Sequence, residues 1–599
     1  MRVRTTRGSG QIGYRVTRRH HDFGFPHDRG NPLRTFAICA LATLAAVACI
    51  VFPPTARAAT SAPAVAPAAH SASVPRPTPA RALIAVPATA RVALPVAAPA
   101  PVASAAAASA PRYALVLQDA VPLRSGAKSG GTPLAFLGQG ELLELRGERM
   151  DYLQVYDLSR ERGGYVRASA VRALTLAPDE APELLALVRF LRDRPGSESL
   201  GLGLAAAWLK AAPAGAITAE GLDAMGTMAE RLAARANAAA ANAANVPVRE
   251  GEPSVAAQLE VAAGLGVRIA SLERDGHVRL CYDGDAWRHV LALSPTPAQS
   301  ARAALALTRH DCIADTTPPL ERWRIDRARA DVLARVPVTD LAPWMRNRIR
   351  MRQAGVWSAI AFEDSRRLAF PGDAATTGLP SVGPNDVLVA GNEALEALAG
   401  IDKAELADDD QSTYADAAMR VGASRWAGEP VLEPAATGLR VATQPGQPGE
   451  TCVLLLDAKH GVDRPLARRC TFGTVWTASA RANAGSTALT LAVQPLATWR
   501  ELWMFRATPD GWTLQVLPPS TEAGGVGYVE FAGWVPGAGE VLVAREVRDP
   551  LHGNKLARTY ELLDGQTLVT KKAADAPASL KAFYRFQDPA WKRVTVSLR

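Results

Sequence analysis

Hydrophobic and polar positions alternate in short segments between residues 113 and 176. Such a two-residue period is typical of half-buried β-strands. The segments cover residues 113–117, 140–145, 152–156 and 164–167. Glycines such as Gly138 and Gly147 stand between them at the spacing of hairpin turns. Because short strands joined by tight turns close readily on themselves, we predict a small β-barrel over residues 113–176.

After residue 178 the apolar positions recur at helical spacing instead. Two such sets are Leu184, Leu187, Val188 and Leu191, and Ile325, Val332, Leu333 and Val336. Apolar residues three and four positions apart share one helix face. Prolines punctuate the region where helices start or break. Short connections between helices favour antiparallel neighbours, so we predict an α-helical hairpin domain over residues 178–370, with about eight helices.

The strand pattern returns in the last part of the chain. Residues 371–430 are rich in Gly and Pro at their start and predict a linker with short helices. Residues 431–599 predict a C-terminal all-β domain. Its candidate strands are 451–457, 488–493, 501–507, 528–535, 540–545 and 558–563. Their spacing leaves an incomplete propeller and a sandwich both open, and the expected fold class is multidomain α+β.

The segment 113–176 resembles a bacterial SH3 domain. The matching pieces are Val121-Pro122-Leu123-Arg124-Ser125, Gly140-Glu141, Gly147-Glu148-Arg149-Met150-Asp151-Tyr152-Leu153-Gln154-Val155 and Gly164-Tyr165-Val166. Tyr152 and Tyr165 stand where the family usually has Trp. The resemblance implies a non-catalytic module that binds cell-wall peptides or protein partners.

Four side chains of this segment are candidates for ligand binding. They are Arg124, Tyr113, Tyr152 and Tyr165. Aromatic faces and arginine suit peptide recognition, because both offer large contact areas together with polar groups. The alternative is that the tyrosines fill a small core.

The first 112 residues predict where the chain works. An apolar run at residues 36–52 follows a long basic region and precedes Ala56 and Ala58, the small residues that a signal peptidase requires. As a helix, the run spans about 26 Å, less than the hydrocarbon core of about 30 Å. We predict a signal peptide over residues 1–58, with an uncleaved anchor as the alternative. An uncleaved segment would be the protein's only contact with a membrane.

A stretch rich in Ala and Pro, residues 59–112, follows the predicted cleavage site and predicts a disordered tether. In both alternatives the rest of the chain is exported, to the periplasm or cell envelope. Expected partners are therefore a cell-wall peptide or an envelope protein. The net charge is +7 for residues 1–58, +4 for residues 59–112 and −2 for the remainder. Since the folded part is not basic, we do not expect it to bind nucleic acid.

Four cysteines follow the tether, and an oxidising compartment favours disulfides between them. Three connectivities are possible. Neighbours in sequence fall within the same predicted domain, so we expect the pairs Cys281–Cys312 and Cys452–Cys470.

Residues typical of an enzyme site do not occur in a recognisable arrangement. The histidines after the tether lack the spacing of zinc ligands. We therefore expect no catalytic residues, no metal site and no cofactor. The alternative functions are a cell-wall-modifying enzyme whose site the sequence does not reveal, and a scaffold that binds proteins through its helical hairpins.

Overall fold

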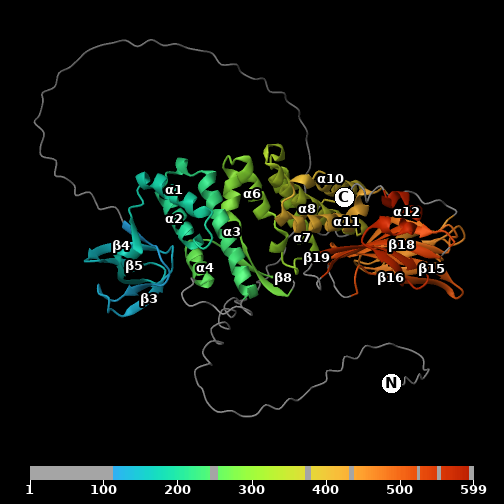
Figure 1. Ribbon diagram of the computed structural model, residues 1–599, viewed down its shortest axis with the longest axis horizontal. Coiled ribbons are helices and arrows are strands. Elements are labelled where there is room, and N and C mark those ends of the chain that lie inside the picture. Colours follow the sequence, from blue (N-terminus) through green and yellow to red (C-terminus); the bar gives the residue numbers. More distant parts are fainter. Residues whose placement is uncertain are drawn as a thin grey trace, which may run out of the picture. The chain divides into compact units, whose positions relative to one another are not determined.

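The computed structural model describes residues 112–242, 254–274, 276–370, 380–430, 438–521, 526–537, 539–549 and 555–592 (Figure 1). The chain forms two units, residues 1–104 and 105–599, and all described residues belong to the second. The predicted signal peptide and, except for Arg112, the predicted tether lie outside the described residues. None of the described helices combines the length and the apolar composition that a membrane span requires. The described part is a mixture of helices and several separate sheets.

The first seven strands form one antiparallel sheet. They are β1 (Arg112–Val116), β2 (Val121–Arg124), β3 (Pro133–Leu137), β4 (Leu142–Arg149), β5 (Tyr152–Asp157), β6 (Arg162–Arg167) and β7 (Val171–Leu174). Their order is β3-β2-β6-β5-β4-β1-β7. Alternate residues, among them Leu123, Val155 and Val166, fill a core on one face.

The prediction of a closed barrel is wrong for this sheet. The two end strands of the order, β3 and β7, are five and four residues long and do not pair with each other in the described part of the chain. Only one register pair, Arg124 with Tyr165, joins β2 to β6. The hairpin β2–β3 is thus held to the rest of the sheet by little backbone pairing, and the sheet stays open.

Four helices follow this sheet and share a core with its residues Leu115 and Leu174, and the second helix lies beside the strands (Figure 1). They are α1 (Ala181–Arg192), α2 (Glu198–Ala211), α3 (Ala219–Asn242) and α4 (Val255–Gly264). Leu184 and Val188 are buried, which confirms the predicted helical face of α1, and they share a core with Leu115 of the sheet. Gly140 adopts a φ of +95°, and a side chain there would collide with the carbonyl group of Ser199 at the start of α2. The sheet and the helices are therefore in close backbone contact.

The helical region also contains a hairpin that the sequence did not predict. Strands β8 (Ile269–Arg274) and β9 (His277–Tyr282) pair before the helices α5 (Asp285–Ala292), α6 (Pro297–Leu307), α7 (Pro319–Ala334) and α8 (Pro343–Ala369). Asn237 of α3 binds both backbone groups of Leu280, at 2.8 Å each. The hairpin is stabilised by these tertiary contacts, and its half-exposed residues give no clean two-residue period.

The predicted linker, residues 371–430, contains two full helices. Helices α10 (Pro384–Ala399) and α11 (Gln411–Ser424) pack against α8. Small and apolar residues, including Ala354, Ala394 and Val421, form the contact. This described part is therefore integral to the helical packing. A linker with short helices is therefore not the right description of the described residues 380–430. The sequence did not indicate the packing, since small residues allow close helix contacts without a strong apolar pattern.

Three successive antiparallel meanders make up the C-terminal region. The first contains β10 (Arg440–Pro445), β11 (Thr451–Leu456) and β12 (Ala467–Thr471). The second contains β13 (Thr474–Ala482), β14 (Ala488–Leu496), β15 (Trp499–Thr508) and β16 (Gly511–Leu517). The third contains β17 (Gly527–Val535), β18 (Glu540–Asp549), β19 (Lys555–Asp564) and β20 (Thr570–Ala574). A short parallel pairing of β15 with β17 joins the last two into one eight-stranded sheet.

Both faces of the second meander are buried. Phe505 of β15 packs with Val453 of β11, whereas Met504 packs with Val543 of β18. The outer face of the third meander is covered by α12 (Lys581–Phe586), whose Phe583 is fully buried. The described residues of this region are thus mainly strands, followed by a short helix at the end.

Both predicted cysteine pairs lie at disulfide distance. Cys281 of β9 joins Cys312 of the 3₁₀ helix η4 (His310–Cys312), with Cα atoms 5.8 Å apart. Cys452 and Cys470 occupy opposite register positions on β11 and β12. The first bridge closes a loop through α5 and α6, whereas the second joins strands that are already paired.

Candidate functional site

Three of the predicted ligand-binding residues lie on one face of the β1–β7 sheet. Arg124 stands opposite Tyr165, which in turn stands opposite Gln154. Opposite residues of neighbouring strands point to the same side, as do residues two apart on one strand, so Tyr152 shares this face. Arg124 donates to the carbonyl oxygen of Gly131 at 2.8 Å. Tyr165 is half-buried and Tyr152 is buried, so Tyr152 contributes mainly to packing.

Tyr113 shares the same face but lies at a distance from the other three. It stands opposite Glu144, and Glu144 stands opposite Tyr156, which is two residues from Gln154. Three strand spacings separate β1 from β6, or about 14 Å. The structure therefore brings Arg124 and Tyr165 together and places Tyr113 elsewhere.

A cavity lies beside Tyr113, between the sheet and the helices α2 and α4. Its volume is about 430 Å³, within the range of small-ligand sites. Its lining includes Tyr113, Glu141, Asp157, Arg160, Lys210 and Glu260. The Lys210 ammonium group lies 5.6 Å from the centre of the Tyr113 ring, within cation–π distance. We call this the tyrosine cavity.

Arg160 forms a fixed part of the cavity wall. It donates to Glu141 and to Asp157, each at 2.7 Å. Burial alone would raise the pKa of Asp157, but hydrogen bonds from Arg160 and Ser159 outweigh it and lower that pKa below its ordinary value. These charges satisfy one another, so they shape the wall and leave little for a ligand.

Lys210 and Glu260 are the charges of the wall that remain open to a ligand. Both side chains are exposed, and neither forms an ion pair with any described residue. One cation and one carboxylate beside an aromatic ring suit a molecule that carries both charges, such as a peptide end. Sequence reasoning missed both residues, because they come from α2 and α4, far from Tyr113 along the chain.

One group of side chains in the described part has the spacing of metal ligands. It consists of Glu450, Cys452 and Cys470. The two sulfur atoms are at bonding distance from each other. A sulfur atom in a disulfide is not a thiolate, so neither cysteine can act as a metal ligand or a nucleophile in this state.

Helix α8 carries a carboxyl group with an unusual pKa. Burial raises the pKa of Glu363 to about 7, although Arg366 and Arg322 lie near enough to lower it. The neighbouring Asp364 accepts hydrogen bonds from Trp323 at 2.7 Å and Arg327 at 2.5 Å. Glu363 is thus a protonated acid below neutral pH, and its ionisation opposes folding.

We expect the variant Glu363→Gln to become more stable than the unchanged chain as the pH rises. The native state binds this proton more tightly than the unfolded chain, whose ordinary pKa is 4.5. The stabilisation from Glu363 is therefore complete below pH 4.5 and is lost as the pH rises to about 7. The difference between the two chains should grow by about 1 to 3 kcal/mol over this interval.

Urea unfolding of both chains at a series of pH values measures this difference. Comparing the two chains cancels the titration of all other groups. If the difference in free energy of unfolding between the two chains stays constant from acidic to neutral pH, the pKa of Glu363 is not raised in the native state.

Comparisons of the chain with protein-family models, with curated proteins and with solved structures give no match in any of the three.

Proposed function

We propose that this chain is a non-catalytic, exported protein of the cell envelope that binds a peptide, from the cell wall or a partner protein, through its SH3-like sheet. The tyrosine cavity supports this proposal best. It combines the Tyr113 ring with a cation, Lys210, and a carboxylate, Glu260, neither of which pairs with a described residue. Cell-wall peptides and the ends of protein chains carry amines and carboxylates, which these two side chains match in charge.

The outer face of the sheet offers a second contact area for the same ligand. Arg124 lies on β2, and Tyr165, on the neighbouring β6, lies three strand spacings, or about 14 Å, from Tyr113, across β5 and β4. An extended peptide of four to five residues spans roughly that distance. Tyr156, which carries the Arg146 guanidinium 3.7 Å above its ring, lies between them. The helical and β-rich regions serve in this proposal as the scaffold that completes the cavity.

Binding to purified peptidoglycan tests the proposal. The full chain is used, because α2 supplies Lys210 and contacts the sheet through Gly140. We expect the unchanged chain to sediment with peptidoglycan and Lys210→Ala to bind about tenfold more weakly, the value of one charge-assisted contact. Lys459→Ala, which alters an exposed lysine of the β-rich region, is the matched control and should bind normally.

Two results would count against this proposal. Absence of sedimentation by the unchanged chain would eliminate the cell-wall ligand. Equal loss of binding in Lys210→Ala and Lys459→Ala would show that the tyrosine cavity is not the binding site.

A further inference from the structure

A second cavity, lined by arginines, lies among the helices and is distinct from the tyrosine cavity. Its volume is about 330 Å³. The lining side chains come from β8, η4, α8, α11 and the end of β18. The charged or polar ones are Arg274, His310, Asp311, Arg352, Ser412, Thr413, Asp416, Arg420 and Arg548. We call this the arginine pocket.

The carboxylates of the pocket do not balance its arginines. Asp416 accepts hydrogen bonds from both Arg420 and Arg548, at 2.8 Å each, so two cations share one anion. Asp311 is engaged by two further arginines outside the pocket lining, Arg279 and Arg309. With four arginines and two carboxylates, the lining carries a formal net charge of +2, although Arg274 also pairs with Asp315 outside the lining, at 3.8 Å.

Arg352 is the least compensated of the four. Its guanidinium donates to the carbonyl oxygen of Leu305 at 2.9 Å and to the Thr308 hydroxyl at 3.4 Å, and it forms no ion pair with a described residue. Burial lowers the pKa of Arg352 to about 10, and the charges of Arg329, Arg309 and Arg420 contribute to this shift. The arginines destabilise one another, and an anion between them would relieve that repulsion.

His310 adds a hydrogen-bond donor to the same space. Arg329 lies 3.1 Å from His310 Nδ1, and since a guanidinium can only donate, Nδ1 must accept and the proton must sit on Nε2. Burial and the charges of Arg420 and Arg329 lower the pKa of His310 well below its ordinary value, so the ring is neutral. Nε2 faces Gly355 of α8, where an added Cβ would approach it to 2.7 Å.

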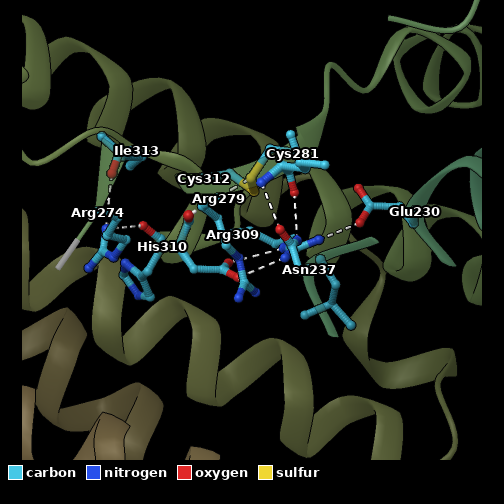
Figure 2. Close-up of a disulfide and its surroundings, with 12 residues drawn as sticks. Glu230, Asn237, Arg274, Arg279, Cys281, Arg309, His310, Cys312 and Ile313 are labelled. Atoms are coloured by element: carbon cyan, nitrogen blue, oxygen red, sulfur yellow. Dashed lines mark hydrogen bonds and ion pairs between the residues drawn. A yellow bond between two sulfur atoms is a disulfide. The ribbon is translucent and has the colours of Figure 1, made fainter. Parts of the chain in front are cut away.

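The surrounding backbone holds this arrangement in place. Figure 2 shows Arg274 and His310 on one side of the Cys281–Cys312 bridge and Asn237 and Glu230 on the other. Arg274 donates to the carbonyl oxygens of His310 and Ile313, at 2.9 Å each. The disulfide ties η4, which carries His310, to the hairpin that carries Arg274. The donors are therefore positioned before any ligand arrives.

A network of structural ion pairs is the simpler explanation for clustered arginines. It accounts for Arg279 and Arg309, which both bind Asp311. It does not account for Arg352, which forms no ion pair with a described residue. Uncompensated buried cations cost free energy, and such costs are typical of binding sites.

We propose that the arginine pocket binds a phosphate group, either free or carried by a small organic molecule as a phosphomonoester. A phosphomonoester carries a charge of about −1.5 to −2 at pH 7, which matches the net +2 of the lining. Arginine forks, a neutral histidine donor and the hydroxyls of Ser412 and Thr413 are the groups that phosphate oxygens accept from. The volume leaves room for a small organic part. This site is independent of the peptide-binding proposal.

Calorimetric titration of the full chain tests the phosphate proposal. The probes are inorganic phosphate and glycerol phosphate, with chloride and succinate at equal ionic strength. We expect both phosphates to bind, chloride not to bind, and Arg352→Gln to weaken phosphate binding roughly tenfold or more. Arg352→Lys should restore part of the affinity. Tighter binding of glycerol phosphate than of inorganic phosphate would identify an organic phosphate as the ligand.

The matched control is Arg346→Gln. Arg346 is a half-buried arginine of the same helix that also donates to backbone carbonyls, those of Val338 and Leu341, but it does not line the pocket. The variant Arg346→Gln should bind phosphate with the affinity of the unchanged chain. If Arg352→Gln fails to fold, Arg548→Gln, whose side chain is about one-third exposed, provides the test.

Three results would overturn the phosphate proposal. They are no binding of either phosphate by the unchanged chain, tighter binding of succinate than of phosphate, and equal phosphate affinity in the unchanged chain and the folded pocket variant.

Discussion

Replacing Glu530 with alanine should lower the free energy of unfolding by about 3 to 5 kcal/mol. Glu530 of β17 is buried and forms ion pairs with two buried arginines, Arg425 and Arg500. Burial lowers the pKa of Arg500 to about 10, Glu530 opposes this shift, and Arg425 adds to it. Without Glu530, two guanidinium charges stay out of water with no carboxylate partner in the part of the chain that the structure describes. Removing one member of a buried ion pair in this way is strongly destabilising.

The loss should affect the contact between helices and sheets. Arg500 of β15 also donates to the carbonyl oxygen of Gly422 at 2.7 Å, near the end of α11. Arg425 belongs to the short helix η8 (Arg425–Gly428) that follows α11. Urea unfolding measures the total effect, and hydrogen exchange in α11 and β17 locates it.

The matched control for Glu530→Ala is Glu540→Ala. Glu540 pairs with Lys571 at 3.1 Å on the surface, where the lysine side chain is 40% exposed. Exposed ion pairs contribute only about 0 to 1 kcal/mol. Equal destabilisation by the two variants would contradict the view that the buried ion pairs of Glu530 with Arg425 and Arg500 hold the helices and sheets together.

Removing the Cys281–Cys312 bridge by a double alanine substitution should lower the free energy of unfolding by about 3 to 4 kcal/mol. The two cysteines are 31 positions apart, and the bridge restricts the unfolded chain over that whole loop. In the native state it ties the β8–β9 hairpin to η4. Hydrogen exchange should therefore increase first in β8 and β9, which have few other backbone partners.

The Cys452–Cys470 bridge serves as the comparison. It closes a shorter loop, of 18 positions, between strands that already form a backbone ladder. Its removal should destabilise the chain less than removal of Cys281–Cys312. A stability unchanged by the loss of Cys281 and Cys312 would contradict the chain-entropy argument for this loop.

Part of the architecture could be predicted from local sequence patterns. The two-residue period of 152–156 and the helical spacing of Leu184 and Val188 follow from which face each residue buries, and both were confirmed. The cysteine pairs were also predictable, because neighbours in sequence are brought together at the lowest entropic cost.

Other features depend on contacts between distant segments. The sequence of helices α10 and α11 shows no apolar period, because small residues such as Ala394 pack closely against α8 without one. The β1–β7 sheet is open because its end strands, β3 and β7, do not pair with each other in the described part of the chain. Separate domains were expected, yet Arg500 of the sheets binds backbone carbonyls of α11.

The tyrosine cavity and the arginine pocket also combine features that follow from local sequence with features that depend on contacts between distant segments. Residue types along the sequence were enough to name some of the side chains that could take part, such as Tyr113. Folding places Lys210 and Glu260 beside Tyr113, and it brings Arg352, Arg420 and Arg548 into one pocket with two carboxylates. The reason is physical: residue type and period report the local face of an element, whereas charge balance and ligand geometry arise between elements that are far apart along the chain.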